Sequence, residues 1–158
     1  MDTEKLLKLL KENKVIFVVI GASAFPVYGY ARATLDIDIF IRSDMENIRR
    51  LIRALKEFGY DLTDLKPRDF LENKILIRQY TVEADFHPFV KGITFDEVWK
   101  NRISAKFGET RVNFPSLGDM IRMKKAAGRA IDLEDLKYLK RIKEKKEAKQ
   151  RKKASKKT

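Results

Sequence analysis

The chain has 158 residues, of which 44% are hydrophobic and 37% charged, with a formal net charge of +12. This length and composition are typical of one globular domain that folds without crosslinks. The absence of cysteine and the presence of one histidine exclude disulfides, thiolate nucleophiles, iron–sulfur clusters and multi-histidine metal sites within one chain. The same features, with the abundance of Lys and Glu, favour a cytoplasmic and thermophilic protein.

The first part of the chain is predicted to form a helix followed by two strands. Asp2 or Thr3 caps the helix, which buries one leucine face. Residues 15–20 form an apolar, β-branched run that predicts a buried strand. Residues 35–41 alternate in polarity, which indicates a strand with one aliphatic face. The leucines expected on the helix face are Leu6, Leu9 and Leu10.

The middle of the chain is predicted to form a helix, a connection and a hairpin. Ser43 with Glu46 matches a capping box, which opens a helix that ends near Gly59. Residues 66–73 indicate a polar connection. Residues 74–80 and 82–89 indicate two strands, arranged as a hairpin.

The last part of the chain is predicted to be mainly helical. Thr94 caps a short helix, and residues 103–114 hold a pair of short strands. Ser116 caps a helix to about residue 127, and Asp132 caps a final helix. Four residues make the apolar stripe of that final helix: Leu133, Leu136, Leu139 and Ile142. The fold class is therefore α/β (α+β), with a mixed sheet flanked by helices.

The positive charge is concentrated at the C-terminal end. Residues 140–158 hold eleven basic and two acidic residues, whereas residues 1–139 carry a net charge of +3. We therefore expect a domain at 1–139 and a basic extension at 140–158 that is either helical or disordered. Such an extension is either a contact for nucleic acid or a solvated end, because charge alone names no partner.

Two carboxylates share one face of the strand at 35–41. Asp36 and Asp38 lie two residues apart, so their Cα atoms are roughly 6.5 to 7 Å apart. They repel each other unless a cation, donor or proton intervenes, and Mg²⁺ prefers oxygen ligands of this kind. The alternative is an ordinary acidic, solvent-facing strand surface.

A third carboxylate comes from the strand at 82–89. Asp85 can join Asp36 and Asp38 if the two strands are neighbours. Three carboxylates can hold two cations about 3.5 to 4 Å apart, the spacing used for in-line displacement at phosphorus. Glu83 competes for this role by parity, and His87 on the same face is more often structural than a ligand.

A short turn follows the first strand. Gly21 allows close backbone approach to an anion at the start of a helix, and the hydroxyl of Ser23 can add a donor. On its own this signal is weak, because many turns contain glycine and serine.

Together these residues resemble the signature of the polymerase-β-like nucleotidyltransferase superfamily. The branch that is most similar contains minimal and abortive-infection toxin-type nucleotidyltransferases, with the pattern Gly-Gly-x-Ala, His-Gly, Arg-x-Thr, Asp-x-Asp. The matching residues here are Gly21, Ala22, Ser23, Ala24, Gly29, Arg32, Thr34, Asp36 and Asp38. Ala22 replaces the second glycine, and Tyr28 stands where histidine is frequent.

The resemblance continues near the C-terminus. A Lys-x-x-Ala-x-Arg-x-x-Asp-x-x-Asp segment of that branch is matched by Lys124, Ala127, Arg129, Asp132 and Asp135. Lys124 either reaches a triphosphate or is structural. An Arg–Asp network that joins the last two helices is the favoured interpretation of the other charged residues.

The resemblance implies a metal-dependent nucleotidyltransferase that moves a nucleoside monophosphate from a nucleoside triphosphate such as ATP to a hydroxyl and releases pyrophosphate. Asp36, Asp38 and Asp85 would be catalytic and would bind two Mg²⁺ ions, with Mn²⁺ as an alternative. The nucleotide-binding residues would be Gly21, Ala22, Ser23, Arg32, Thr34 and Lys124.

The acceptor stays open among an RNA end, a protein and a small molecule, and the basic extension favours RNA. A partner protein, as in toxin–antitoxin pairs, or a second copy of the chain would complete the open side of the cleft; no membrane is expected. The alternatives are a nucleic-acid-binding module without turnover and a non-catalytic nucleotide-binding partner protein.

Overall fold

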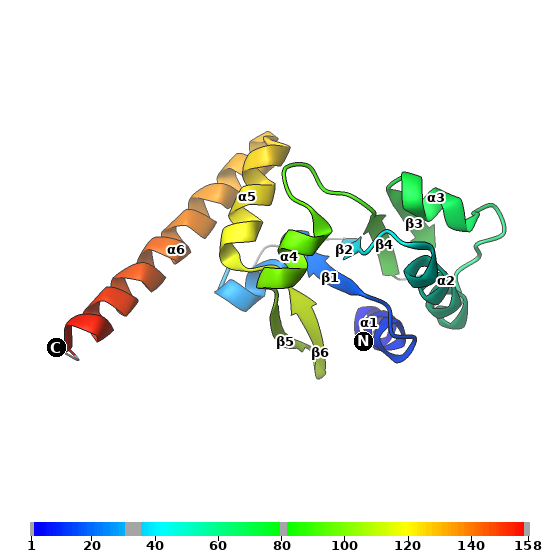
Figure 1. The fold of residues 1–158 in the computed structure, drawn as a ribbon, viewed down its shortest axis with the longest axis horizontal. Coiled ribbons are helices and arrows are strands. Elements are labelled where there is room, and N and C mark those ends of the chain that lie inside the picture. The colour runs from blue at the N-terminus through cyan, green and yellow to red at the C-terminus, as the bar shows by residue number, and fades with distance from the viewer. Residues whose placement is uncertain (1, 31–35, 80–81, 157–158) are drawn as a thin grey trace.

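The architecture is centred on a four-stranded mixed sheet (Figure 1). It is seen in a computed structural model that describes residues 2–30, 36–79 and 82–156. The strand order is β1-β2-β4-β3, in which β2 and β4 are parallel and the two edge strands are antiparallel to their neighbours. The strands are β1 (Phe17–Ile20), β2 (Asp36–Ile41), β3 (Ile75–Gln79) and β4 (Val82–His87).

Helices flank this sheet, and a separate two-stranded sheet joins them, so the expected mixed α and β class is confirmed. The small sheet pairs β5 with β6 in antiparallel fashion, as the sequence predicts. The remaining elements are α1 (Asp2–Glu12), a 3₁₀ helix η1 (Gly21–Tyr28), α2 (Met45–Phe58), α3 (Pro67–Glu72), α4 (Phe95–Asn101), β5 (Ile103–Phe107), β6 (Thr110–Phe114), α5 (Leu117–Ala127) and α6 (Ala130–Lys156).

One face of the sheet is fully covered and forms the main core. The aliphatic face of β2 is buried there, together with alternate residues of β3 and β4 and the apolar stripes of α1 and α2. α2 ends at Gly59, whose φ of +108° is a conformation that other residues rarely adopt. The buried residues of β2 on this face are Ile37, Ile39 and Ile41.

The opposite face of the sheet is covered over only part of its length. Phe40 is buried there with Val18 and Ile20 of β1, and Val98 of α4 packs over them. Asp36 and Asp38 continue the same face of β2 beyond this cover, because alternate residues of a strand point to the same side. The cluster of Val18, Ile20, Phe40 and Val98 is a second, smaller core. Asp36 and Asp38 lie beyond its edge, on a part of the face that solvent can reach.

Several local expectations need correction. Asp44, not Ser43, caps α2 by accepting a hydrogen bond from the backbone of Asn47, while the Ser43 hydroxyl donates to the carbonyl of Pro88. Residues 66–73 are not an irregular connection, because Pro67 and the Asp69 carboxylate start a short helix there. In α1 the buried positions are Leu6, Leu7 and Leu10, so Leu7 takes the place expected for Leu9.

The chain ends in a helical hairpin of α5 and α6. Ser116 caps α5, as expected, and Gly128 turns the chain with a φ of +66°. Asp132 does not cap α6; it lies inside the first turn and is fully buried, and Leu133 is exposed rather than part of the buried stripe.

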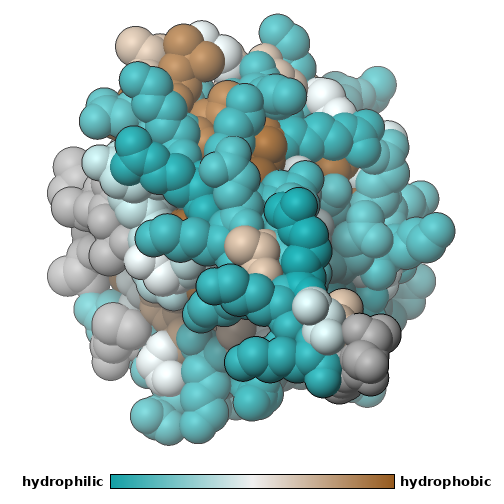
Figure 2. All heavy atoms as spheres, turned by 90° about the vertical axis from the view of Figure 1, so that its left-hand side faces the viewer, coloured by the Kyte–Doolittle hydropathy of each residue, from teal (hydrophilic) through white to brown (hydrophobic). Residues whose placement is uncertain are grey.

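The C-terminal end of α6 extends away from the rest of the molecule, beyond Lys146, whose Nζ lies 4.7 Å from the centre of the Tyr28 ring (Figure 1). The helix continues to Lys156, and every residue from 143 to 156 is exposed. Figure 2 views this side of the molecule and shows that hydrophilic side chains cover most of it. Among the residues described, no helix combines the length and the apolar character that a bilayer crossing requires.

Candidate functional site

The pairing of β2 with β4 brings carboxylates from two strands together. In the parallel register Asp38 lies opposite Asp85, and Asp36 lies opposite Glu83. Paired residues of neighbouring strands point to the same side of the sheet. The three aspartates singled out in the sequence therefore lie on one face, and Glu83 lies on it too.

Asp38, Asp85 and His87 form a compact group of metal-ligand types. One ligand atom from each lies within 4.8 Å of the others. The imidazole Nε2 of His87 is 2.8 Å from Oδ1 of Asp38. The Asp85 side chain is 7% exposed and that of Asp38 is 29% exposed, so the group is largely buried and Asp38 is its more accessible carboxylate.

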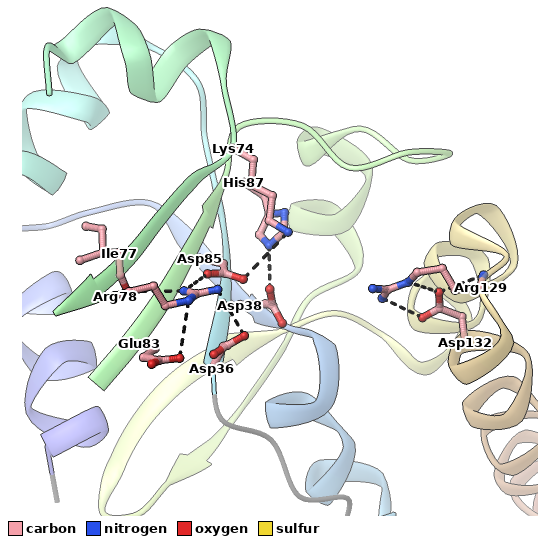
Figure 3. Close-up of polar contacts among 10 residues, drawn as sticks. All are labelled: Asp36, Asp38, Lys74, Ile77, Arg78, Glu83, Asp85, His87, Arg129 and Asp132. Atoms are coloured by element: carbon pink, nitrogen blue, oxygen red, sulfur yellow. Dashed lines mark hydrogen bonds and ion pairs between the residues drawn. The ribbon is translucent and has the colours of Figure 1, made fainter. Parts of the chain in front are cut away.

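Arg78 of β3 is the cation that holds the acidic face together (Figure 3). Its guanidinium donates to Oδ1 of Asp85 at 2.5 Å and lies 3.5 Å from both Asp36 and Glu83. The hydrogen bond to Asp85 raises the pKa of Arg78. A hydrogen bond with Asp36 raises the pKa of Glu83, because two carboxyl groups can share a hydrogen bond only if one of them carries a proton.

Gly21 lies against the same carboxylates, at the point where β1 turns into η1. Its φ is +68°, and a Cβ placed on it would be only 2.6 Å from Oδ2 of Asp38. The absence of a side chain at position 21 is therefore what allows the turn to approach the Asp38 carboxylate. The turn at residues 21–23 therefore requires glycine at its first position because the Asp38 carboxylate lies so close.

A cavity of about 610 Å³ opens in front of this acidic face. Asp36, Asp38 and Asp85 line one side, and the other side is formed by α5 and the start of α6. Figure 3 shows the Arg129 guanidinium directed across this space toward Asp38. The cavity therefore has an acidic side, formed by the three aspartates, and a basic side, formed by Lys124 and Arg129. This arrangement suits a ligand that has some anionic groups bound through metal ions and others free to contact the basic side chains.

The basic side rests on two buried carboxylates. Lys124 Nζ lies 3.0 Å from Asp132 and 3.4 Å from Asp135, both of which are fully buried. Arg129 contacts Asp132 through its backbone nitrogen and its guanidinium. Burial raises the pKa of Asp132, but hydrogen bonds from Arg129 and Lys124 outweigh this effect and lower the pKa to about 2. Lys124 joins α5 to α6, whereas the Arg129–Asp132 contact favoured by the sequence interpretation lies at the start of α6 and does not itself join the two helices.

The sequence-predicted nucleotide residues are distributed unevenly around the cavity. Gly21 and Lys124 line it, whereas Ala22 is buried and Ser23 is partly buried in the first turn of η1. Arg32 and Thr34 lie outside the described residues. The Tyr28 hydroxyl donates to the carbonyl of Pro115, and burial raises its pKa to about 12, which makes Tyr28 a structural contact here.

Sequence reasoning missed three residues at the site. Arg78 could have been found from hairpin parity, because antiparallel pairing of β3 with β4 places it opposite Glu83. Lys74 lies 3.9 Å from Asp85 and lines the cavity, but nothing in its local sequence distinguishes it from other lysines. Phe89 also lines the cavity and was assigned only to the end of a strand.

Comparison with known families identifies the kind of protein to which this geometry belongs. A family model described as "Nucleotidyltransferase of unknown function (DUF6036)" matches residues 2–145. The chain belongs to this nucleotidyltransferase family. The match covers the whole sheet and most of α6, and it confirms the nucleotidyltransferase resemblance. No curated protein matches the chain.

Nucleotidyltransferases generally use divalent metals, and the residues present fit such an ion. Asp38 and Asp85 offer the hard oxygen ligands that Mg²⁺ prefers, and His87 adds a nitrogen within the same 4.8 Å group. Gly21 leaves the Oδ2 side of Asp38 uncrowded. Arg78 holds Asp85 and approaches Asp36, so a metal ion at these carboxylates would have to compete with its guanidinium.

Proposed function

We propose that this nucleotidyltransferase is active and metal-dependent, and that it transfers a nucleoside monophosphate from a nucleoside triphosphate to a hydroxyl group. The oxygen of the acceptor would form a bond to the α-phosphorus, the bond from that phosphorus to the β-phosphate oxygen would break, and pyrophosphate would leave. The observation that carries the proposal is the pairing of Asp38 with Asp85 at the edge of a cavity with an opposing basic side.

The three aspartates are assigned to metal binding. Asp36, Asp38 and Asp85 would hold two Mg²⁺ ions, or Mn²⁺ in their place, and bound cations neutralise charge that develops on the transferred phosphoryl group. Asp85 is the most deeply buried of the three. Asp85 would also accept the proton that the acceptor hydroxyl loses.

The triphosphate is assigned to the turn and to the basic side of the cavity. The first turn of a helix has backbone N–H groups without intrahelical acceptors, and Gly21, Ala22 and Ser23 occupy that turn in η1. Arg129 lines the cavity with a largely exposed side chain. Lys124 would contribute positive charge from within its network with Asp132 and Asp135. Arg32 and Thr34 remain assigned to the nucleotide by the sequence resemblance alone.

For the acceptor we propose RNA, on the basis of α6. Its exposed second half is rich in Lys and Arg, and such a surface binds phosphate backbones through release of counterions. A variant with Lys149, Arg151, Lys152 and Lys153 changed to Gln should weaken RNA binding and reduce the salt dependence of the affinity. An unchanged affinity and salt dependence would argue for a protein or small-molecule acceptor.

The test of catalysis is transfer of radioactive label. The purified chain is incubated with each α-labelled triphosphate, Mg²⁺ and total RNA, and labelled acceptor is separated on a gel. The double variant Asp36→Asn with Asp38→Asn should abolish labelling while thermal melting stays nearly unchanged. Asp64→Asn, an exposed aspartate in a turn, is the matched control and should label normally.

The outcomes separate the competing functions. Equal labelling by the double variant would refute the assignment of the aspartates. Mg²⁺-dependent nucleotide binding by the wild-type chain without any transfer would favour the non-catalytic partner protein. RNA binding that survives loss of both aspartates, again without transfer, would favour a nucleic-acid-binding module.

A further inference from the structure

The cavity has an apolar part that the proposed chemistry leaves unused. Next to the charged residues it is lined by several apolar side chains, and Phe89 stands out because its exposed fraction is 65%. No other large apolar side chain among residues 2–30, 36–79 and 82–156 is as exposed. The apolar lining residues are Ile20, Phe89, Val90, Met123 and Ala127.

The exposure of Phe89 does not come from a loosely held loop. Pro88 before it is buried, and its carbonyl accepts a 2.6 Å hydrogen bond from the Ser43 hydroxyl. Val90 after it packs on the second core and forms a β-bridge with Ile93. The turn at Gly92 approaches α5 so closely that an added Cβ would lie 2.6 Å from Ala126. The backbone on both sides of Phe89 is thus fixed, and the ring is presented to the cavity.

The position of Phe89 relates it directly to the carboxylates. It follows His87 by two residues, so the two Cα atoms are at most about 7 Å apart. The Phe89 ring and two members of the acidic group, Asp85 and His87, therefore border the same cavity from one continuous segment, β4 and the loop after it. A ligand that reaches the carboxylates through bound metal ions and also contacts the ring would carry anionic groups at one end and an apolar or aromatic group at the other.

We propose that Phe89 is the stacking platform for the nucleobase of the nucleoside triphosphate. This inference rests on the proposed function, since it assigns the base of the same substrate. A phenyl ring offers a π-face and no hydrogen-bonding group, so it binds any base and discriminates only by stacking strength. Purine triphosphates should therefore bind more tightly than pyrimidine triphosphates, and recognition of a base edge must come from other residues.

The test compares a ligand that has a base with one that lacks it. Affinities for ATP, CTP and inorganic tripolyphosphate are measured by calorimetry in the presence of Mg²⁺. Loss of one base–aromatic stack corresponds to a weakening of about 5- to 150-fold, so Phe89→Ala should weaken ATP binding by that factor. The affinity of Phe89→Ala for tripolyphosphate should stay unchanged, and Phe89→Trp should retain ATP binding.

A matched control removes another exposed apolar side chain elsewhere. Leu133 on α6 is 51% exposed and lies outside this cavity, so Leu133→Ala should bind ATP and tripolyphosphate as the wild-type chain does. Thermal melting of each variant establishes that it is folded.

Three results would overturn the inference, and they are distinguishable. If Phe89→Ala binds ATP as tightly as wild type, the base lies elsewhere while the proposed function stands. If Phe89→Ala loses ATP and tripolyphosphate equally, the ring supports the loop rather than the base. If the wild-type chain binds neither ligand with Mg²⁺, the proposed function fails and this inference fails with it.

Discussion

The closeness of Gly21 to Asp38 allows a sharp test of how the turn supports the acidic group. In Gly21→Ala the new Cβ would lie 2.6 Å from Oδ2 of Asp38, whereas ordinary contacts begin at 3.4 Å. The carboxylate must therefore retreat by about 0.8 Å. A misplacement of about 1 Å can lower a reaction rate about 100-fold, and we expect a loss of that size in nucleotidyl transfer.

The same substitution also has a backbone cost that must be separated from the contact. A residue with a Cβ at a φ of +68° costs roughly 1 to 2 kcal/mol, which for a chain of this size lowers the melting temperature by about 2 to 8 °C. Gly59→Ala is the control, because Gly59 also has a positive φ but has open space around it. It should lose stability and keep activity.

The assay combines thermal melting with single-turnover transfer of a labelled nucleotide under saturating Mg²⁺. Both variants should melt below the wild-type temperature, and only Gly21→Ala should lose transfer. If the two variants lose activity to the same extent, or if Gly21→Ala transfers label at the wild-type rate, the contact with Asp38 does not position the carboxylate and the reasoning fails.

Three further predictions concern stability. Because the pKa of Asp132 is lowered to about 2 from 3.8, its charged form stabilises the fold by on the order of 2 kcal/mol above about pH 4, and this stabilisation is lost as the pH falls toward 2. Urea unfolding of Asp132→Asn should therefore show a lower free energy of unfolding at pH 7 and a shallower dependence on acid. An unchanged pH profile would contradict the network of Asp132 with Lys124 and Arg129. Arg78→Gln removes the guanidinium among Asp36, Glu83 and Asp85, so it should melt lower without Mg²⁺ and gain more than wild type when Mg²⁺ is added. An equal Mg²⁺-induced shift would show that Arg78 does not compete with an ion for these carboxylates. Asp44→Ala should lower the free energy of unfolding by about 1 kcal/mol in urea, because Asp44 caps α2, and no loss would count against that cap.

Local patterns in the sequence predicted most elements because their signals are local. Alternation in residues 35–41 places the aliphatic and acidic side chains of β2 on opposite faces whatever the strand packs against. Cap residues such as Thr94 and Ser116 act within three residues of themselves, and both cap the predicted helices. Where two adjacent residues both qualify as caps, as with Ser43 and Asp44, the choice depended on a distant carbonyl that captured one hydroxyl.

Other features depended on which elements become neighbours. The side chain of Arg78 points to the acidic face only because β3 pairs with β4 in one particular register. Asp132 has the sequence context of a cap, yet it is buried because α6 packs on α5, which delivers Lys124 to it. The burial of Asp132 is a property of that packing, whereas its contact with Arg129, three residues away, is local.

The sequence by itself determined the nucleotidyltransferase family, the three aspartates and the glycine turn, because these are residue types at short, fixed spacings. Only the tertiary structure decided that Asp85 stands beside Asp38, that Arg78 contacts the carboxylates of the acidic face, and that Phe89 borders the same cavity. The physical reason is that strand pairing and helix packing bring distant segments together, and the free energy of that burial is shared over the whole core rather than encoded at any one position.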